Sequence, residues 1–114
     1  MIKAILMVKR RSGLSREEFR ERYESGHAPL ALQTLPSLRH YVRNYLEPTN
    51  GIEPPFDVIT EFWYDDVEGQ AETQNIYLND PAQVLQRDEE EFMDRASMVS
   101  FSVVECASDV STRG

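Results

Sequence analysis

The chain has 114 residues, which is enough for one domain and too few for two independent hydrophobic cores. Hydrophobic residues make up 40% of it and aromatic residues 10%, values that are ordinary for a globular protein and too high for a disordered one. The formal net charge is −8, and the one basic run, residues 9–11, is too short to bind phosphates along a nucleic acid, so we expect no nucleic-acid partner.

Membrane, disulfide and metal signals are missing from the sequence. No apolar run approaches the roughly 20 residues that are needed to span a bilayer, and the amino-terminal residues do not resemble a signal peptide. The single cysteine, Cys106, cannot form an intramolecular disulfide, and no spacing of cysteine and histidine suggests zinc. We therefore expect a cytoplasmic protein with no membrane partner, no metal site and no cofactor.

The first part of the chain predicts a strand followed by an interrupted helix. Residues 2–9 are apolar on both alternating faces, which indicates a strand that is buried on both sides. Ser15 and Glu18 have the spacing of a capping box, so a helix should begin there. Pro29 removes a backbone donor and restricts the residue before it, so the helix should kink or restart near His27.

Two strands follow in the middle of the chain. Residues 38–46 alternate between two faces, and residues 57–64 form an aromatic-rich run typical of a strand. The segment between them, residues 49–55, contains one glycine and two adjacent prolines and predicts a loop.

The last part of the chain predicts a helix in two pieces and a final strand. Asp66 and Asp80 are placed to cap the two helical pieces. The second piece should carry Asp88 on its apolar side and the glutamates 89–91 around the other side. Residues 99–105 should form the last strand.

This order of elements predicts an α+β fold of the ferredoxin-like, split βαβ type. It consists of a four-stranded antiparallel sheet with its helices on one face, in a domain of residues 1–106 followed by a polar tail, residues 107–114. The first strand is apolar on both sides, so the open face of the sheet also needs a cover. A second copy of the chain is the simplest cover, and we expect a homodimer.

Four segments resemble the EthD-like family of the dimeric α/β-barrel superfamily. The match covers almost everything from Ile2 to Glu105, and only Glu68 to Leu78 matches poorly. The resemblance implies an α/β barrel formed by a dimer, with a pocket between sheet and helices in each protomer. That superfamily contains cofactor-free isomerases, cyclases, dehydratases and decarboxylases as well as small monooxygenases, so the resemblance indicates the fold more firmly than the function. The four segments are KRRSGLSREEFRERYESGHAPL, LPSLRHYVRNY, FDVITEFWYDD and DEEEFMDRASMVSFSVVE.

His27 and Asp88 are the main candidates for chemistry. His27 lies on the same helical stripe as Tyr23, beside the expected break, so its imidazole should point into the domain and could exchange protons near neutral pH. It also falls at the H-A-P-L position of the family that the chain resembles. The alternative is a buried histidine that binds a carbonyl freed by Pro29. Asp88 shares a face with Phe92 and could act as an acid or base, or simply tilt into water.

The two central strands offer further candidates on opposite faces. His40 and Asn44 share one face of their strand and Tyr41 lies on the other, and the sequence does not decide which face lines the pocket. Tyr41 could assist catalysis, and His40 or Asn44 could contact a substrate. Glu61 is either a pocket residue or, as we favour slightly, the ion-pair partner of an arginine on a neighbouring strand.

Aromatic side chains could contact a flat ligand, although such residues more often belong to a core or an interface. The candidates that we assign to substrate binding are Tyr23, Trp63 and Phe92.

Three functions fit these observations. The first is a cofactor-independent lyase or isomerase that acts on an aromatic, polyketide-like or lactone intermediate in degradation or secondary metabolism. The second is a non-catalytic protein that binds a small hydrophobic or aromatic metabolite. The third is a haem-binding or monooxygenase protein, in which only His27 or His40 could be the axial ligand.

Overall fold

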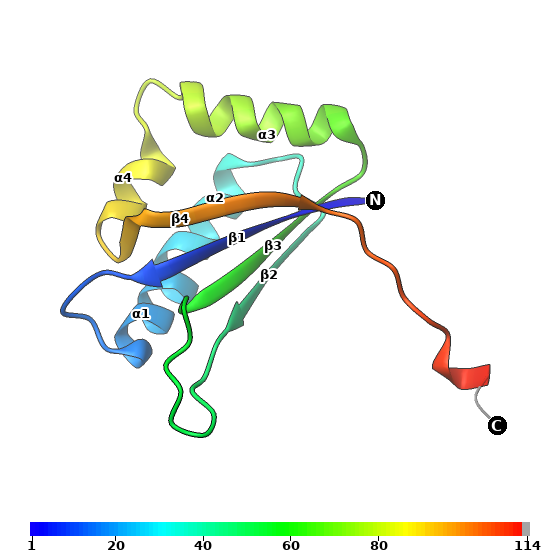
Figure 1. The fold of residues 1–114 in the computed structure, drawn as a ribbon. Helices are drawn as coiled ribbons and strands as arrows, with labels where there is room; N and C mark the ends of the chain where they lie inside the picture. Colours follow the sequence, from blue (N-terminus) through cyan, green and yellow to red (C-terminus); the bar gives the residue numbers. More distant parts are fainter. Residues whose placement is uncertain (113–114) are drawn as a thin grey trace.

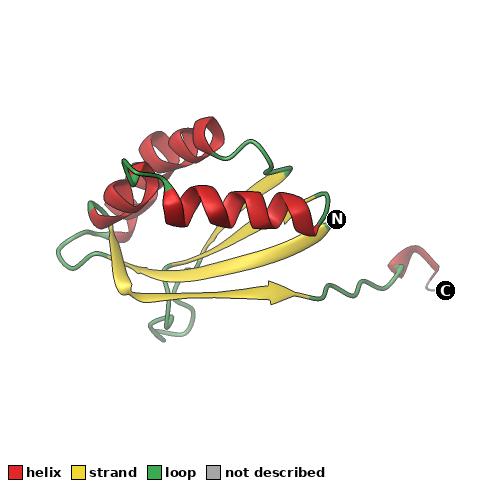
Figure 2. Ribbon diagram, turned by 90° about the horizontal axis from the view of Figure 1, so that it is seen from above, coloured by secondary structure: helices red, strands yellow, loops and turns green. Residues whose placement is uncertain are grey.

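The computed structural model describes residues 1–112 as two layers, a twisted sheet and a set of helices packed on one of its faces (Figures 1 and 2). The elements in chain order are β1 (Ile2–Arg10), α1 (Arg16–Arg22), the π-helical turn η1 (Tyr23–His27), α2 (Ala28–Thr34), β2 (His40–Tyr45), β3 (Val58–Tyr64), α3 (Val67–Asn79), α4 (Val84–Glu90), β4 (Met93–Val103) and the 3-10 turn η2 (Val110–Thr112).

All neighbouring strands are antiparallel, and their order is β2-β3-β1-β4. The two strands at the centre, β1 and β3, are thus far apart in the sequence, as a split βαβ arrangement requires. The predicted ferredoxin-like fold is confirmed.

Local signals set the start and the break of the first helix. The Ser15 hydroxyl accepts a hydrogen bond from the Glu18 amide at 3.1 Å, and the Glu18 carboxylate accepts one from the Ser15 amide at 2.9 Å, which completes the capping box. The helix widens into η1 and then restarts as α2, with Pro29 in its first turn. A single π-helical turn of this kind is rare and often found at functional sites.

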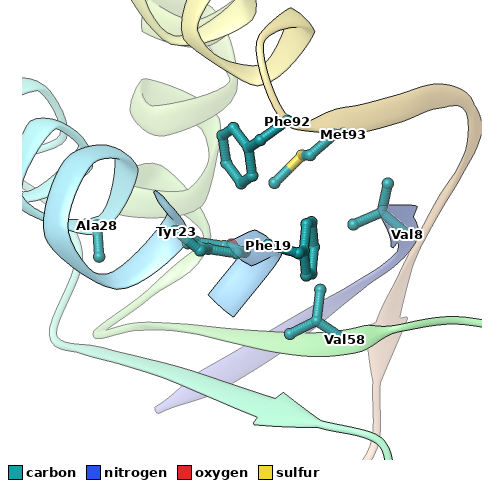
Figure 3. Close-up of a cluster of buried hydrophobic side chains, with 7 residues drawn as sticks. All are labelled: Val8, Phe19, Tyr23, Ala28, Val58, Phe92 and Met93. Carbon is teal, nitrogen blue, oxygen red and sulfur yellow. The ribbon is translucent and has the colours of Figure 1, made fainter. Parts of the chain in front are cut away.

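The core lies between the sheet and the helices. One cluster of buried side chains joins β1, β3, α1, η1 and the start of β4 (Figure 3). Phe19 and Tyr23 meet edge to face with ring centroids 6.1 Å apart, and Phe92 packs against both. The members of the cluster are Val8, Phe19, Tyr23, Ala28, Val58, Phe92 and Met93.

The last strand begins earlier than the sequence predicts. It starts at Met93, where residues 99–105 were expected to form the strand, and α4 ends at Glu90. Phe92, which was expected on the same helical face as Asp88, therefore lies beyond the end of α4, and Met93 pairs with Arg10 of β1. The pairing of β1 with β4 shifts its register between Met7 and Lys9, and this irregularity accommodates the early start of β4.

The face of the sheet away from the helices is uncovered within one protomer (Figure 2). Register pairs place a row of mostly apolar side chains on this open face, from all four strands. The expectation that both faces of β1 are buried is met on the helix side, where Ala4, Leu6 and Val8 are buried. The apolar members of the open face are Ile5, Met7, Val42, Ile59, Trp63, Val99, Phe101 and Val103.

Beyond β4 the chain leaves the domain body and ends in η2 (Figure 1). The last two residues of the predicted tail, 113 and 114, lie outside the described residues. None of the helices within residues 1–112 has both the length and the apolar character needed to cross a lipid bilayer.

Candidate functional site

A cavity of about 610 Å³ lies between the sheet and helices α2, α3 and α4. Such a volume is typical of a small-molecule site. Its walls are mainly apolar and aromatic, and its few ionisable side chains gather at one end. The aromatic wall consists of Tyr23, Tyr41, Phe62, Tyr64 and Tyr77, and the ionisable groups at the polar end include His27, Glu89 and Arg95.

His27 ends the π-helical turn, and its side chain points into the domain with 4% of the residue exposed. Its Nδ1 lies 2.8 Å from Asp88 Oδ2. A carboxylate at this distance accepts the Nδ1 proton, which leaves Nε2 as the basic nitrogen of a neutral ring. The second oxygen of Asp88, Oδ1, accepts a hydrogen bond from Arg22 Nη2 at 2.5 Å. Arg22, Asp88 and His27 thus form a chain that fixes the ring.

Asp88 and His27 were predicted separately, and the structure brings them together. The partner of His27 is this carboxylate, which sits behind the ring and outside the cavity wall. Burial alone would raise the pKa of Asp88, but hydrogen bonds from Arg22 and His27 outweigh it and lower the pKa. Burial lowers the pKa of His27, and the interaction with Asp88 only partly opposes this effect. The ring is therefore neutral near pH 7.

Glu89 is the ionisable residue that the sequence analysis missed. It was placed on the solvent side of its helix, and this prediction is wrong, because only 4% of the residue is exposed. Its Oε2 lies 3.8 Å from His27 Nε2, and Oε1 accepts a hydrogen bond from the Tyr77 hydroxyl at 2.5 Å. The signal that could have found it is the i, i+4 spacing from Leu85, which is also buried.

The environment of Glu89 favours its neutral form. Burial raises the pKa of Glu89 to about 7, although the Tyr77 hydroxyl and Arg95 act in the opposite direction. Arg95 Nε lies 3.4 Å from Glu89 Oε1. Two adjacent carboxyl groups, Asp88 and Glu89, thus have opposite pKa shifts and face opposite nitrogens of one imidazole.

Two buried phenols line the cavity beside His27. The Tyr23 hydroxyl lies 2.8 Å from Thr60 Oγ1, and the Tyr41 hydroxyl donates a hydrogen bond to Tyr23 at 3.3 Å. Burial raises the pKa of both phenols, so both are neutral hydrogen-bonding groups. Phe92 packs on the His27 ring with centroids 5.3 Å apart, but it belongs to the core and not to the cavity wall.

The remaining four predicted residues lie on the open face of the sheet. His40, Asn44, Glu61 and Trp63 point away from the cavity, because Tyr41 and its alternating neighbours take the helix side of β2. Glu61 accepts hydrogen bonds from Asn44 at 2.9 Å and from Trp63 at 3.1 Å. It also forms the expected ion pair, with Lys3 of the neighbouring strand at 3.7 Å in place of an arginine. No part of this group lines the cavity.

Gly26 lies against Arg22, and a Cβ at this position would overlap the guanidinium that pairs with Asp88. We expect the Gly26→Ala variant to fold, because alanine favours helix by about 1 kcal/mol over glycine and the clashing group is a flexible side chain. The displaced Arg22 charge would no longer lower the pKa of His27, so this pKa should rise. Proton NMR titration of the His27 ring measures the change.

The matched variant is Arg22→Gln, which removes the Arg22 charge without changing the backbone. It should also raise the His27 pKa. An unchanged His27 titration in both variants would show that Arg22 does not act on the ring.

Residues 1–112 contain no group of three or more histidine, cysteine, aspartate or glutamate side chains placed to hold a metal ion. Two carboxyl groups, Asp88 behind the ring and Glu89 in the cavity, face the two nitrogens of His27.

The model of the EthD domain matches residues 11–96, which is most of the chain. The chain belongs to the EthD domain family. No curated protein matches it. Among solved structures, an EthD family protein from Bacillus halodurans is similar with a TM-score of 0.66 and 21% identity, over 93% of this chain and 100% of that one. A dimeric ferredoxin-like protein of unknown function from Thermobifida fusca has a TM-score of 0.60 and 11% identity, over 91% and 90% of the two chains.

The hydroxynitrile lyase from Passiflora edulis is also similar, with a TM-score of 0.62 and 14% identity over 95% of each chain. Identities this low show a shared fold and no more. In this EthD protein the poorly matching segment, residues 68–78, lies within α3 and contributes Gln70, Thr73 and Tyr77 to the cavity wall.

Proposed function

We propose that the chain is a cofactor-independent lyase or isomerase that moves a proton on an aromatic, polyketide-like or lactone compound. The observation that carries the proposal is the orientation of His27. Asp88 binds Nδ1 at 2.8 Å, so the basic Nε2 is directed to the polar end of an aromatic-lined cavity. A neutral imidazole held in this way is suited to act as a general base near neutral pH.

The other groups of the site fit the same chemistry. Tyr41 and Tyr23 offer neutral hydroxyls that can orient a substrate oxygen, and the aromatic wall suits a flat hydrophobic compound. The similarity to a hydroxynitrile lyase adds support for a lyase on this fold, and the activity of that protein is not carried over.

The partner that we propose for the open face is a second copy of the chain. Apolar side chains from four strands lie on this face, together with the polar group of Lys3, His40, Asn44 and Glu61, and the similar Thermobifida fusca protein is dimeric. Two such faces packed together would bury apolar area that is exposed in one protomer.

The test uses 2-tetralone, an aromatic ketone with acidic hydrogens next to its carbonyl. We expect the wild-type protein to accelerate exchange of these hydrogens in D₂O and His27→Asn to lose ~100-fold or more of this rate. Proton NMR follows the exchange. His40→Asn is the matched control, because His40 lies on the other face of the sheet and should leave the rate unchanged.

A wild-type protein that binds the ketone without faster exchange would contradict the enzyme proposal and favour a metabolite-binding role. The haem alternative requires an axial histidine in an open pocket. His40 lies on the open face of the sheet and does not line the cavity, and Glu89 Oε2 lies 3.8 Å from His27 Nε2. A stable red complex with added haemin would favour that alternative.

A further inference from the structure

The site contains two carboxyl groups that meet the same imidazole, and only one of them has a role so far. Asp88 and Glu89 are consecutive residues of α4, and they face Nδ1 and Nε2 of His27 respectively. Asp88 is bound to Arg22 and stands outside the cavity. Glu89 lines the cavity, and its Oε2 is the oxygen nearest to the basic nitrogen of His27.

We propose that Glu89 is a second catalytic residue, which exchanges a proton with the substrate oxygen while His27 exchanges one with carbon, and that the substrate is an enolisable carbonyl compound. This inference rests on the proposed function, because it assumes that His27 is a base. Nothing in the sequence pattern of the chain or in the comparisons assigns a role to Glu89.

The geometry leaves one oxygen of Glu89 for this task. Oε1 is occupied by the Tyr77 hydroxyl at 2.5 Å and approached by Arg95 Nε at 3.4 Å. Oε2 faces His27 Nε2 at 3.8 Å, which is too long for a hydrogen bond. A substrate carbonyl oxygen that binds beside Oε2 would place the adjacent carbon near Nε2.

The reaction is balanced without a cofactor. His27 Nε2 takes a proton from the carbon next to the carbonyl, and the C–H electron pair forms a carbon–carbon double bond. The carbonyl π pair moves to oxygen, which takes the proton from Glu89 Oε2. The product is an enol, and the two side chains become an imidazolium and a carboxylate that attract each other. Return of a proton from His27 to the same carbon, and of the hydroxyl proton to Glu89, completes hydrogen exchange. Return of the proton to a different, conjugated carbon completes an isomerisation.

The charges around the pair come from every element that packs against it. Titratable or charged groups reach Glu89 from α3, β4, η1, α4 and β2, and Arg22 of α1 adds a positive charge near His27. Burial is the largest effect on the pKa of both His27 and Glu89. Glu89 holds its proton below about pH 7, and the His27 ring is neutral above its lowered pKa, so the neutral acid and the neutral ring coexist between these two limits. The groups that face Glu89 are Tyr77, Arg95, His27, Asp88, Tyr23 and Tyr41.

The experiment measures 2-tetralone exchange across pH for wild type, Glu89→Gln and Glu91→Gln. The wild-type profile should be bell-shaped, with its alkaline side near pH 7 from ionisation of Glu89. In Glu89→Gln the rate should fall ~100-fold, and the decrease on the alkaline side of the profile should disappear. Glu91→Gln removes an exposed carboxylate that lies outside the ion pairs of Arg95 with Glu89 and Glu90, so it should behave as wild type.

Tyr77→Phe tests the assignment without removing the carboxyl group. The Tyr77 hydrogen bond lowers the pKa of Glu89, so its loss should raise that pKa and move the alkaline side of the profile to higher pH. A merely structural role of Glu89 predicts no such shift.

The outcomes separate the two proposals. Exchange that requires His27 but survives in Glu89→Gln with its alkaline side intact would overturn the role of Glu89 and leave the proposed function standing. An alkaline side that does not move in Tyr77→Phe would also overturn the role of Glu89. Absence of exchange in wild type would overturn both proposals.

Discussion

Phe101→Glu should break the proposed homodimer into monomers. Phe101 pairs with Ile5 on the open face of the sheet and is 57% exposed in one protomer, so a second copy would cover it. A carboxylate buried there without a partner costs ~3–5 kcal/mol, and a homodimer would bury two of them, one from each copy. The dimer dissociation constant should therefore be larger by at least about ten-thousandfold. Sedimentation equilibrium at micromolar protein concentration measures the change.

The control is Val110→Glu, which adds the same charge to a 66% exposed apolar residue in the carboxy-terminal turn, away from the sheet. It should leave the dimer intact. A dimer that tolerates Phe101→Glu would show that the copies meet through another surface, and a monomeric wild type would remove the proposed partner altogether.

The fold was predictable because its signals are local. Ser15 and Glu18 are three residues apart, and their capping box can form as soon as the first turn does. Pro29 interrupts the backbone hydrogen bonds of its own helix, which explains why the break at His27 was anticipated. Alternation in β2 and β3 indicated strands in the same way.

The register of those strands could not be predicted, and neither could the end of α4. The two faces of β2 are similar in polarity, so only the fold shows that Tyr41 lies on the helix side and Asn44 on the open side. The spacing of Asp88 and Phe92 favours a helix that continues past Glu90, but Met93 pairs with Arg10 of β1 and starts a strand. Tertiary contact overrode local preference there.

The candidate site was predictable by residue but not by geometry. His27 and Asp88 were each identified, yet they are 61 residues apart in the sequence and their contact depends on how α4 docks on η1. Glu89 was missed because three consecutive glutamates offer no periodicity of their own. Its burial against Tyr77 and Arg95 places an acid where composition predicts a solvated surface.

Glu89→Gln should raise the free energy of unfolding at alkaline pH. The folded-state pKa of Glu89 is about 7, whereas the ordinary value is 4.5. Below the ordinary value both states hold the proton and the residue adds no penalty. As the pH rises from 4.5 to about 7, Glu89 releases its proton first in the unfolded chain. The free energy of unfolding of the wild type therefore falls until Glu89 also ionises in the folded protein. Above about pH 7 the penalty is constant at ~3 kcal/mol, and glutamine removes it.

Urea unfolding of wild type and Glu89→Gln at about pH 5 and about pH 8.5 measures this difference, with Glu91→Gln as the exposed control. The variant should gain much more stability relative to wild type at the higher pH, and an equal difference at both would contradict the raised pKa. A gain in stability together with a loss of exchange activity would have a simple physical reason. The protein keeps a carboxyl group buried beside His27 at the expense of its own stability, as expected for a group whose proton is used in a reaction.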